Sequence, residues 1–339
     1  MPNIISMNGI RQARSVAVMV LLVVTACGSN TEADAQTATP GSSPAEATAV
    51  GPNNTSPLTV TSTTSLRPTT ATITPVADVG QRIVPVDGDL AEIVFALGLG
   101  DQVVATDISA TYPAAADALP EVGYQRALSA EPILAFEPTI VLATDLAGPG
   151  DTLESLARLD VETVIIERES SPAGPGNKIR AVAAAIGADA VGDGLAADVD
   201  EQIADATRRA SRATTSPRVG VVYLRGDSVQ LLFGEGSGVD WLIDAAGGID
   251  IADELGVINN APVNAEALVV AAPDVLIVPQ RGLDSVGGMD GLLEIPGIAA
   301  TPAGRNERIL VYDDQLLLGN GPRTGQLLNQ LITDLHGDI

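Results

Sequence analysis

The chain has 339 residues, of which 45% are hydrophobic, 2% aromatic and 18% charged. This composition suffices for one large globular unit or two moderate lobes with an aliphatic core. The formal net charge is −25, from 18 Lys and Arg against 43 Asp and Glu. It argues against a nucleic-acid-binding protein, because phosphate recognition needs a basic surface.

The amino end has the features of a signal peptide. Arg11 and Arg14 precede an uncharged run over residues 15–26, about the length of a signal-peptide core and too short to span a bilayer comfortably. The run ends in Val-Thr-Ala-Cys27-Gly, which resembles the bacterial lipobox, in which Cys27 is acylated and becomes the first mature residue. A lipid there would tether the protein to the outer face of the cytoplasmic membrane. The alternative is an incidental thiol after a plain signal peptide.

Residues 28–80 consist mainly of Thr, Ser, Ala, Pro and Gly with scattered acids. Such a segment buries too little apolar surface to offset the entropy of ordering, so we expect a disordered tether. The predicted organisation is a signal peptide at 1–27, this tether at 28–80, an N-terminal lobe at 81–194, a connecting helix at 195–216 and a C-terminal lobe at 217–339.

Strands and helices are predicted to alternate in the first lobe. Leu90, Ile93, Val94 and Leu97 share one helical face, and glycines end the helix. In chain order the patterns predict strand 81–86, helix 90–97, strand 102–106, strand 139–143, helix 152–159 and strand 162–167.

One long helical pattern separates the lobes: residues 195–213 place Leu195, Val199, Ile203 and Ala206 in one apolar stripe. The alternation then resumes, which predicts an α/β fold of two lobes, each a mainly parallel sheet flanked by helices, joined by one long helix. The predicted elements are strands 219–225, 275–280 and 309–313, helix 239–246 and a final helix from 324.

Several short stretches carry a likeness to a known family: residues 82–84, 92–98, 111–115, 119–124, 128–131, 147–149, 234–238, 246–248 and 318–323. They resemble the haemin-binding lipoproteins of bacterial ABC importers, in a likeness running from about residue 81 to the C-terminus. The resemblance implies a class III substrate-binding protein, monomeric and without enzymatic activity, whose lobes close little on their rigid helix. It would capture haem between its lobes outside the cytoplasm and deliver it to an ABC permease and its ATPase.

The resemblance places an axial oxygen ligand of ferric haem at Tyr124, in the segment Pro120 to Glu131. Some relatives use a histidine there, with a tyrosine in the first strand of the second lobe and an arginine two residues later. Tyr223 and Arg225 match that pattern and would share a strand face, so that Arg225 could hydrogen-bond the ligand oxygen. Since the only histidine is His336 in the C-terminal tail, the resemblance leaves a Tyr–Tyr pair, or one tyrosine with a weak second partner.

Each tyrosine also has a structural interpretation, because a tyrosine in a strand or turn commonly packs with a satisfied hydroxyl. Tyr112 and Tyr312 are interpreted as wall or core residues. By the same resemblance, Arg281 is a candidate to orient the first-lobe tyrosine. The haem propionates need local cations in so acidic a protein; the candidates, which could equally be solvated surface charges, are Arg126, Arg225, Arg281 and Arg323.

Glu131 and Glu266 occupy similar positions in the two lobes, each opening a predicted helix. The resemblance implies that such a pair docks onto arginines of the membrane permease. The alternative is that both acids only complement the helix dipole.

Two other functions remain open at this stage. A cobalamin or ferric-siderophore binder of the same transporter class is the nearer alternative. An α/β hydrolase-type enzyme is the more distant one, since the body of the chain has no histidine and no Gly-x-Ser-x-Gly elbow. Residues 234–238 look like a phosphate loop but lack a lysine, so a strand-to-helix turn is predicted. No metal other than haem iron is expected.

Overall fold

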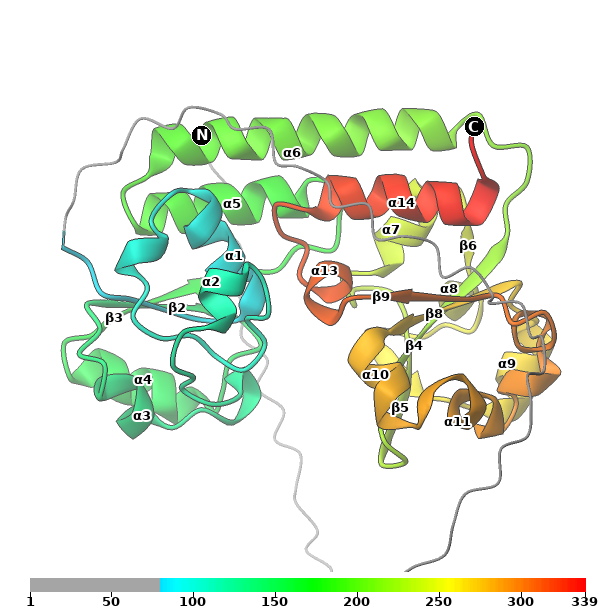
Figure 1. The fold of residues 1–339 in the computed structure, drawn as a ribbon, viewed down its shortest axis with the longest axis horizontal. Coiled ribbons are helices and arrows are strands. Elements are labelled where there is room, and N and C mark those ends of the chain that lie inside the picture. The colour runs from blue at the N-terminus through cyan, green and yellow to red at the C-terminus, as the bar shows by residue number, and fades with distance from the viewer. Residues whose placement is uncertain (1–79) are drawn as a thin grey trace, which may run out of the picture. The chain divides into compact units, whose positions relative to one another are not determined.

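A computed structural model of the chain describes residues 80–339, which form two α/β lobes (Figure 1). The predicted signal peptide, Cys27 and nearly all of the predicted tether lie outside the described residues. Within the described part, no helix combines the length and apolar character that a bilayer crossing requires. The α/β class and the two-lobed organisation with a joining helix are confirmed.

Lobe 1 is built on a three-stranded parallel sheet in the order β1-β2-β3. All residues of β1 and β2 are buried, as expected for parallel strands covered on both faces. The elements are β1 (Ile83–Val86), α1 (Gly88–Ala96), η1 (Gly100–Gln102), α2 (Ala114–Asp117), η2 (Gln125–Ala127), α3 (Ala130–Leu134), β2 (Ile140–Thr144), α4 (Gly150–Arg158), β3 (Glu162–Ile166) and α5 (Gly174–Ala185).

Lobe 2 contains a mixed six-stranded sheet in the order β7-β5-β4-β8-β9, with β6 paired to β4. Strands β4, β6, β8 and β9 pair in parallel, while β5 pairs antiparallel with both β4 and β7. The strands are β4 (Arg218–Arg225), β5 (Val229–Phe233), β6 (Ile249–Asp250), β7 (Asn260–Pro262), β8 (Val275–Pro279) and β9 (Ile309–Tyr312). The helices are α7 (Asp240–Ala245), α8 (Ile251–Glu254), α9 (Ala265–Ala271), α10 (Gln280–Ser285), α11 (Gly288–Glu294), η3 (Ile298–Ala300), α12 (Pro302–Arg305), α13 (Asp314–Leu318) and α14 (Thr324–His336).

The lobes are joined by α6 (Asp189–Ala210), which lies along α5 and α14 (Figure 1). One apolar cluster runs from Ile83 and Leu90 of lobe 1 through Val199 of α6 to Val219 and Leu331 of lobe 2. The lobes therefore share a continuous core beneath the joining helix.

A buried polar junction adds to this core. The side-chain nitrogen of Gln315 donates to the Gly88 carbonyl at 2.8 Å and to Glu92 at 3.1 Å. Arg323 donates to both carboxylate oxygens of Glu92, at 2.7 and 2.8 Å. Lys178 pairs with the buried Asp89 and donates to the Gly319 carbonyl at 2.8 Å. The segment from α13 to α14 is thus hydrogen-bonded directly to α1 and α5.

Three sequence predictions need correction. Residues 102–106 form no strand element: Val103 and Thr106 make only isolated bridges, to Ile83 and Glu121. The joining helix spans Asp189–Ala210 and not 195–213. Several elements were missed, α5 and β5 among them; α5 has a proline in its first turn and an apolar face of Ile179, Val182 and Ala183 that signal a helix.

Candidate functional site

Tyr124 lies on the loop that follows an irregular pairing of residues 106–108 with 120–123. The amide of Ile108 donates to the Gly123 carbonyl at 3.0 Å, and that of Ala127 donates to the Tyr124 carbonyl at 2.8 Å. Gly123 has φ +111°, a conformation that strains other residues. Its turn leaves the Tyr124 side chain 38% exposed, in a position open to a ligand.

Tyr223 lies in β4 of lobe 2 and is half-buried. Its ring stacks on Phe233 of β5 with centroids 5.1 Å apart, and the Arg225 guanidinium carbon lies 4.4 Å from the ring centroid. Arg225 donates to Asp314 at 2.7 Å and to the Leu224 carbonyl at 2.8 Å. The predicted pair of Tyr223 and Arg225 on one strand face is therefore present.

The structure brings the two tyrosines into electrostatic range of each other. Burial raises the pKa of the Tyr223 phenol; Arg225 and Arg126 lower that pKa by their charges, while Tyr124 and Asp314 raise it. Tyr124 and Arg126 come from lobe 1, whereas Tyr223, Arg225 and Asp314 come from lobe 2. Two phenols and two guanidinium groups from both lobes are thus close enough for their charges to interact.

The four predicted arginines differ in their partners. Within residues 80–339, the exposed side chains of Arg126 and Arg281 have no ion pair or side-chain hydrogen bond. Only the backbone amide of Arg281 is bound, by Asp314 at 2.9 Å. Arg323 is instead engaged by Glu92 and lies 3.6 Å over the Tyr112 ring. Arg126 and Arg281 are thus the cations most free to meet an anionic ligand.

Glu131 and Glu266 both lie in the first turn of a short helix, α3 and α9, and both are exposed. The prediction that each acid opens a helix is confirmed. Asn264 caps α9 by accepting from the Ala267 amide, so Glu266 is not required as the cap.

Two acids of lobe 1, the buried Asp107 and the half-buried Asp87, were not predicted as notable residues. Ser109 donates to Asp107 at 2.7 Å, and Thr144 donates to Asp87 at 3.0 Å. Burial raises the pKa of Asp107 to about 6. Burial, with Asp89 and Asp107 as like charges, raises the pKa of Asp87 to about 8. Ser109 is only two residues from Asp107, but Thr144 is 57 residues from Asp87 in the chain, so no local pattern could have revealed that second pair.

The other residues singled out in the sequence are Tyr312, Tyr112, His336 and the glycine-rich segment 234–238. Tyr312 is buried and donates to Asp334 at 2.7 Å, which confirms a core role, whereas Tyr112 is 44% exposed. His336 contacts the Ala246 carbonyl at the end of α14. Residues 234–238 form the predicted strand-to-helix turn, whose Gly236 and Gly238 amides donate to the Asp240 carboxylate.

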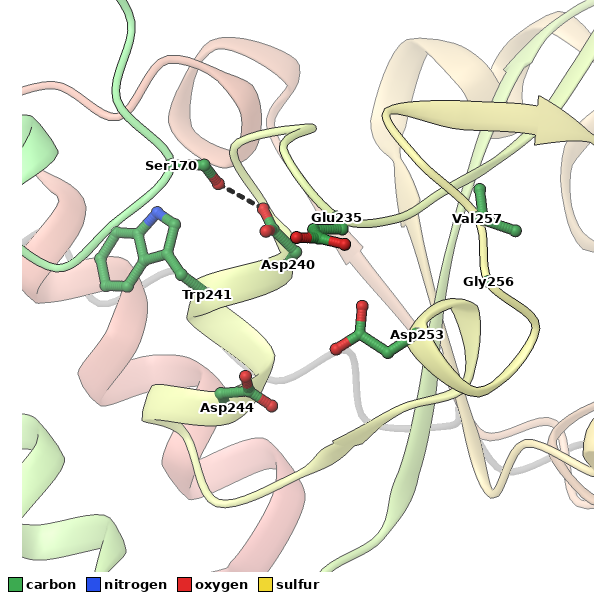
Figure 2. A pocket seen from close by; sticks show the side chains of 8 residues that line it. All are labelled: Ser170, Glu235, Asp240, Trp241, Asp244, Asp253, Gly256 and Val257. Carbon is green, nitrogen blue, oxygen red and sulfur yellow. Dashed lines mark hydrogen bonds between the residues drawn. The ribbon is translucent and has the colours of Figure 1, made fainter.

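A cavity of about 540 Å³ is lined by residues of α7, α8 and adjoining loops (Figure 2). Four of its lining side chains are carboxylates: Glu235, Asp240, Asp244 and Asp253. Neither tyrosine lines it, and its negative charge would repel a propionate. We therefore assign the candidate site to the two tyrosines and not to this cavity.

Comparisons with known proteins agree with the fold. The profile of the family described as "Periplasmic binding protein" matches residues 83–316. The chain is 32% identical over 85 residues to the "Vitamin B12-binding protein" of Yersinia pestis (strain Pestoides F), an alignment covering 25% of this chain and 30% of that protein.

Two solved structures are more similar over a longer span. The periplasmic haem-binding protein RhuT from Roseiflexus sp. RS-1, in apo form, is 48% identical with a TM-score of 0.73, covering 75% of this chain and 97% of RhuT. The haem-binding protein HmuT is 36% identical with a TM-score of 0.71, covering 76% and 84% of the two chains. Solved alanine variants of HmuT replace a histidine, a tyrosine and an arginine two residues after that tyrosine, which is the spacing of Tyr223 and Arg225.

Proposed function

This chain belongs to the periplasmic binding protein family, and from that premise we propose that it captures ferric haem outside the cytoplasm and delivers it to an ABC importer. The observation that carries the proposal is that Tyr124 and Arg126 of lobe 1 lie within electrostatic range of Tyr223, which packs against Arg225 in lobe 2. The haem-binding descriptions of RhuT and HmuT, which match three quarters of the chain, support haem as the cargo.

Phenol chemistry suits ferric haem. A free phenol has a pKa of about 10, so forming a phenolate at pH 7 requires about 4 kcal/mol. Burial raises the pKa of Tyr223 further, so the phenol is neutral in the empty protein. A neighbouring arginine supplies only about 1–3 pKa units of stabilisation, and the ferric ion must supply the rest. Haem binding should therefore release protons.

The propionates of haem need cationic partners. Arg126 and Arg281 fit this role because their side chains are exposed and unpaired among the described residues. Arg225 lies over the ring of Tyr223 and would serve the ligand oxygen of that tyrosine. Arg323 would contribute more weakly, since Glu92 already accepts from two of its three guanidinium nitrogens.

Delivery requires contact with a membrane partner. The exposed Glu131 and Glu266, one on each lobe, would dock onto arginines of the permease, whose ATPase drives import. Cys27, outside the described residues, would carry a lipid that holds the protein, as a monomer, at the outer face of the membrane. Residues 28–80 would then give the lobes the reach to find the permease.

A second cargo is supported by one observation, the match to a vitamin B12-binding protein. That match covers less than a third of the relative, and cobalamin binding would leave the paired tyrosines without an iron ligand role. Ferric siderophores would compete for the same site.

Titration of the purified protein with haemin, cyanocobalamin and a ferric siderophore separates these cargoes. We expect a Soret shift and proton release with haemin in weak buffer, and no competition from equimolar cyanocobalamin. Binding of cyanocobalamin without binding of haemin would refute the proposal.

A further inference from the structure

The ring of Tyr223 is held on both sides by side chains of the same sheet face. On one side Phe233 stacks on it at 5.1 Å with an interplanar angle of 12°. On the other, the guanidinium carbon of Arg225 lies 4.4 Å from its centroid. An aromatic ring and a guanidinium are both favourable neighbours for a phenol face.

The strand register produces this arrangement. In the antiparallel pair of β4 and β5, Phe233 is opposite Val221, Leu231 opposite Tyr223 and Val229 opposite Arg225. Opposed residues share one face, and diagonal neighbours lie within reach of aromatic side chains. Phe233 therefore flanks Tyr223 toward the start of β4, and Arg225 flanks it toward the end.

The hydroxyl of Tyr223 is left available by this arrangement. Within residues 80–339 it makes no hydrogen bond, in contrast to the hydroxyl of Tyr312, which donates to Asp334. Arg225 is itself fixed by Asp314, a residue only 13% exposed. The ring is thus oriented through its faces, without use of its oxygen.

We propose that Phe233 is a positioning residue for Tyr223, holding its ring against Arg225 so that the phenol oxygen is presented to haem iron before haem arrives. This inference rests on the proposed function. A side chain already fixed in its bound orientation loses less entropy when the ligand binds. Phe233 acts through Tyr223 and need not touch haem.

Phe233→Leu keeps an apolar side chain while removing the stack. An aromatic pair contributes about 0.5–1.5 kcal/mol, which corresponds to a Kd for haemin raised about 2- to 12-fold. The absorption band that ferric iron shows with a phenolate should weaken or shift in parallel. Phe233→Tyr keeps the ring, so its Kd for haemin and its absorption band should be close to those of the wild type. Phe136→Leu, the same change as Phe233→Leu but in lobe 1 outside the site, should alter neither the Kd nor the band.

A double-variant cycle tests whether Phe233 acts through Tyr223. Kd for haemin is measured for wild type, Phe233→Leu, Tyr223→Phe and the double variant, with folding checked by circular dichroism. We expect Phe233→Leu to change Kd less than 2-fold in the Tyr223→Phe background. If Phe233→Leu weakens haemin binding as much in the Tyr223→Phe background as in the wild type, Phe233 packs directly on haem and the inference is overturned. A wild-type Kd for Phe233→Leu would also overturn it. Failure of the wild type to bind haemin would instead overturn the proposed function, and this inference with it.

Discussion

Replacing Lys178 by methionine tests the buried junction between the lobes. Lys178 is the only lysine of the chain, and its side chain and that of Asp89 are 4% and 3% exposed. Its ammonium also donates to the Gly319 carbonyl of the segment before α14. Methionine keeps an unbranched side chain that matches lysine out to Cε, and it removes the terminal ammonium with its charge and hydrogen bonds.

The expected loss follows from leaving Asp89 without its partner. Removing one member of a buried ion pair costs about 3–5 kcal/mol, because the other charge remains desolvated. For a folded part the size of residues 80–339, the melting temperature of the Lys178→Met variant should fall by about 6–20 °C.

Urea denaturation at pH 7, followed by circular dichroism, measures this loss as a change in midpoint at constant slope. Arg158→Met is the control, because its pair with Glu154 is 65% and 70% exposed and should contribute less than about 1 kcal/mol. Asp89→Leu combined with Lys178→Met should recover much of the stability. A loss no larger than that of the control, or a double variant as unstable as Lys178→Met, would refute the reasoning.

Three further predictions concern packing, pH and docking. Gly192→Ala should destabilise the protein by about 1–3 kcal/mol, because the new Cβ would lie 2.2 Å from that of Ala183. Gly194→Ala, in the same helix but with nothing within 4 Å of the new Cβ, should be neutral or stabilising. Equal urea midpoints for the two variants would contradict this. Burial raises the pKa of Asp107 to about 6, of Asp250 to about 7 and of Asp87 to about 8. The folded state therefore holds these protons more tightly than the unfolded chain, and the free energy of unfolding should fall as pH rises from 5 to 9; a rise over that interval would be inconsistent with these shifts. Glu131→Lys with Glu266→Lys should abolish haem uptake by cells without changing the Kd for haemin, while Glu201→Lys on α6 should leave both unchanged; normal uptake in the double reversal would exclude the docking role.

Much of the fold could be predicted because local pattern and tertiary packing agree. The apolar runs at β1, β2 and β8 are buried throughout, and α14 begins at Thr324 as predicted. In the joining helix α6, local pattern and tertiary packing disagree. Residues 189–194 contain Gly192 and Gly194, which lower helix propensity, yet Gly192 lets α5 approach so closely that packing outweighs the propensity.

The candidate site was predictable only in part. Resemblance singled out Tyr124, Tyr223 and Arg225 as candidates, and in the structure Tyr124 and Arg225 both act electrostatically on the Tyr223 phenol. It could not show that Arg323 is occupied by Glu92, 231 residues away, nor that Phe233 stacks on Tyr223. Such partners depend on pairings between distant segments, and β5 itself was missed.

The central claim is that two tyrosines, one from each lobe, provide the iron site. The visible spectrum and Kd of the haemin complex, measured for wild type, Tyr124→Phe, Tyr223→Phe and the double variant, test it most directly. We predict that each single variant weakens binding and changes the spectrum, and that the double variant loses the phenolate band altogether. A double variant that keeps the wild-type affinity and spectrum would contradict the account.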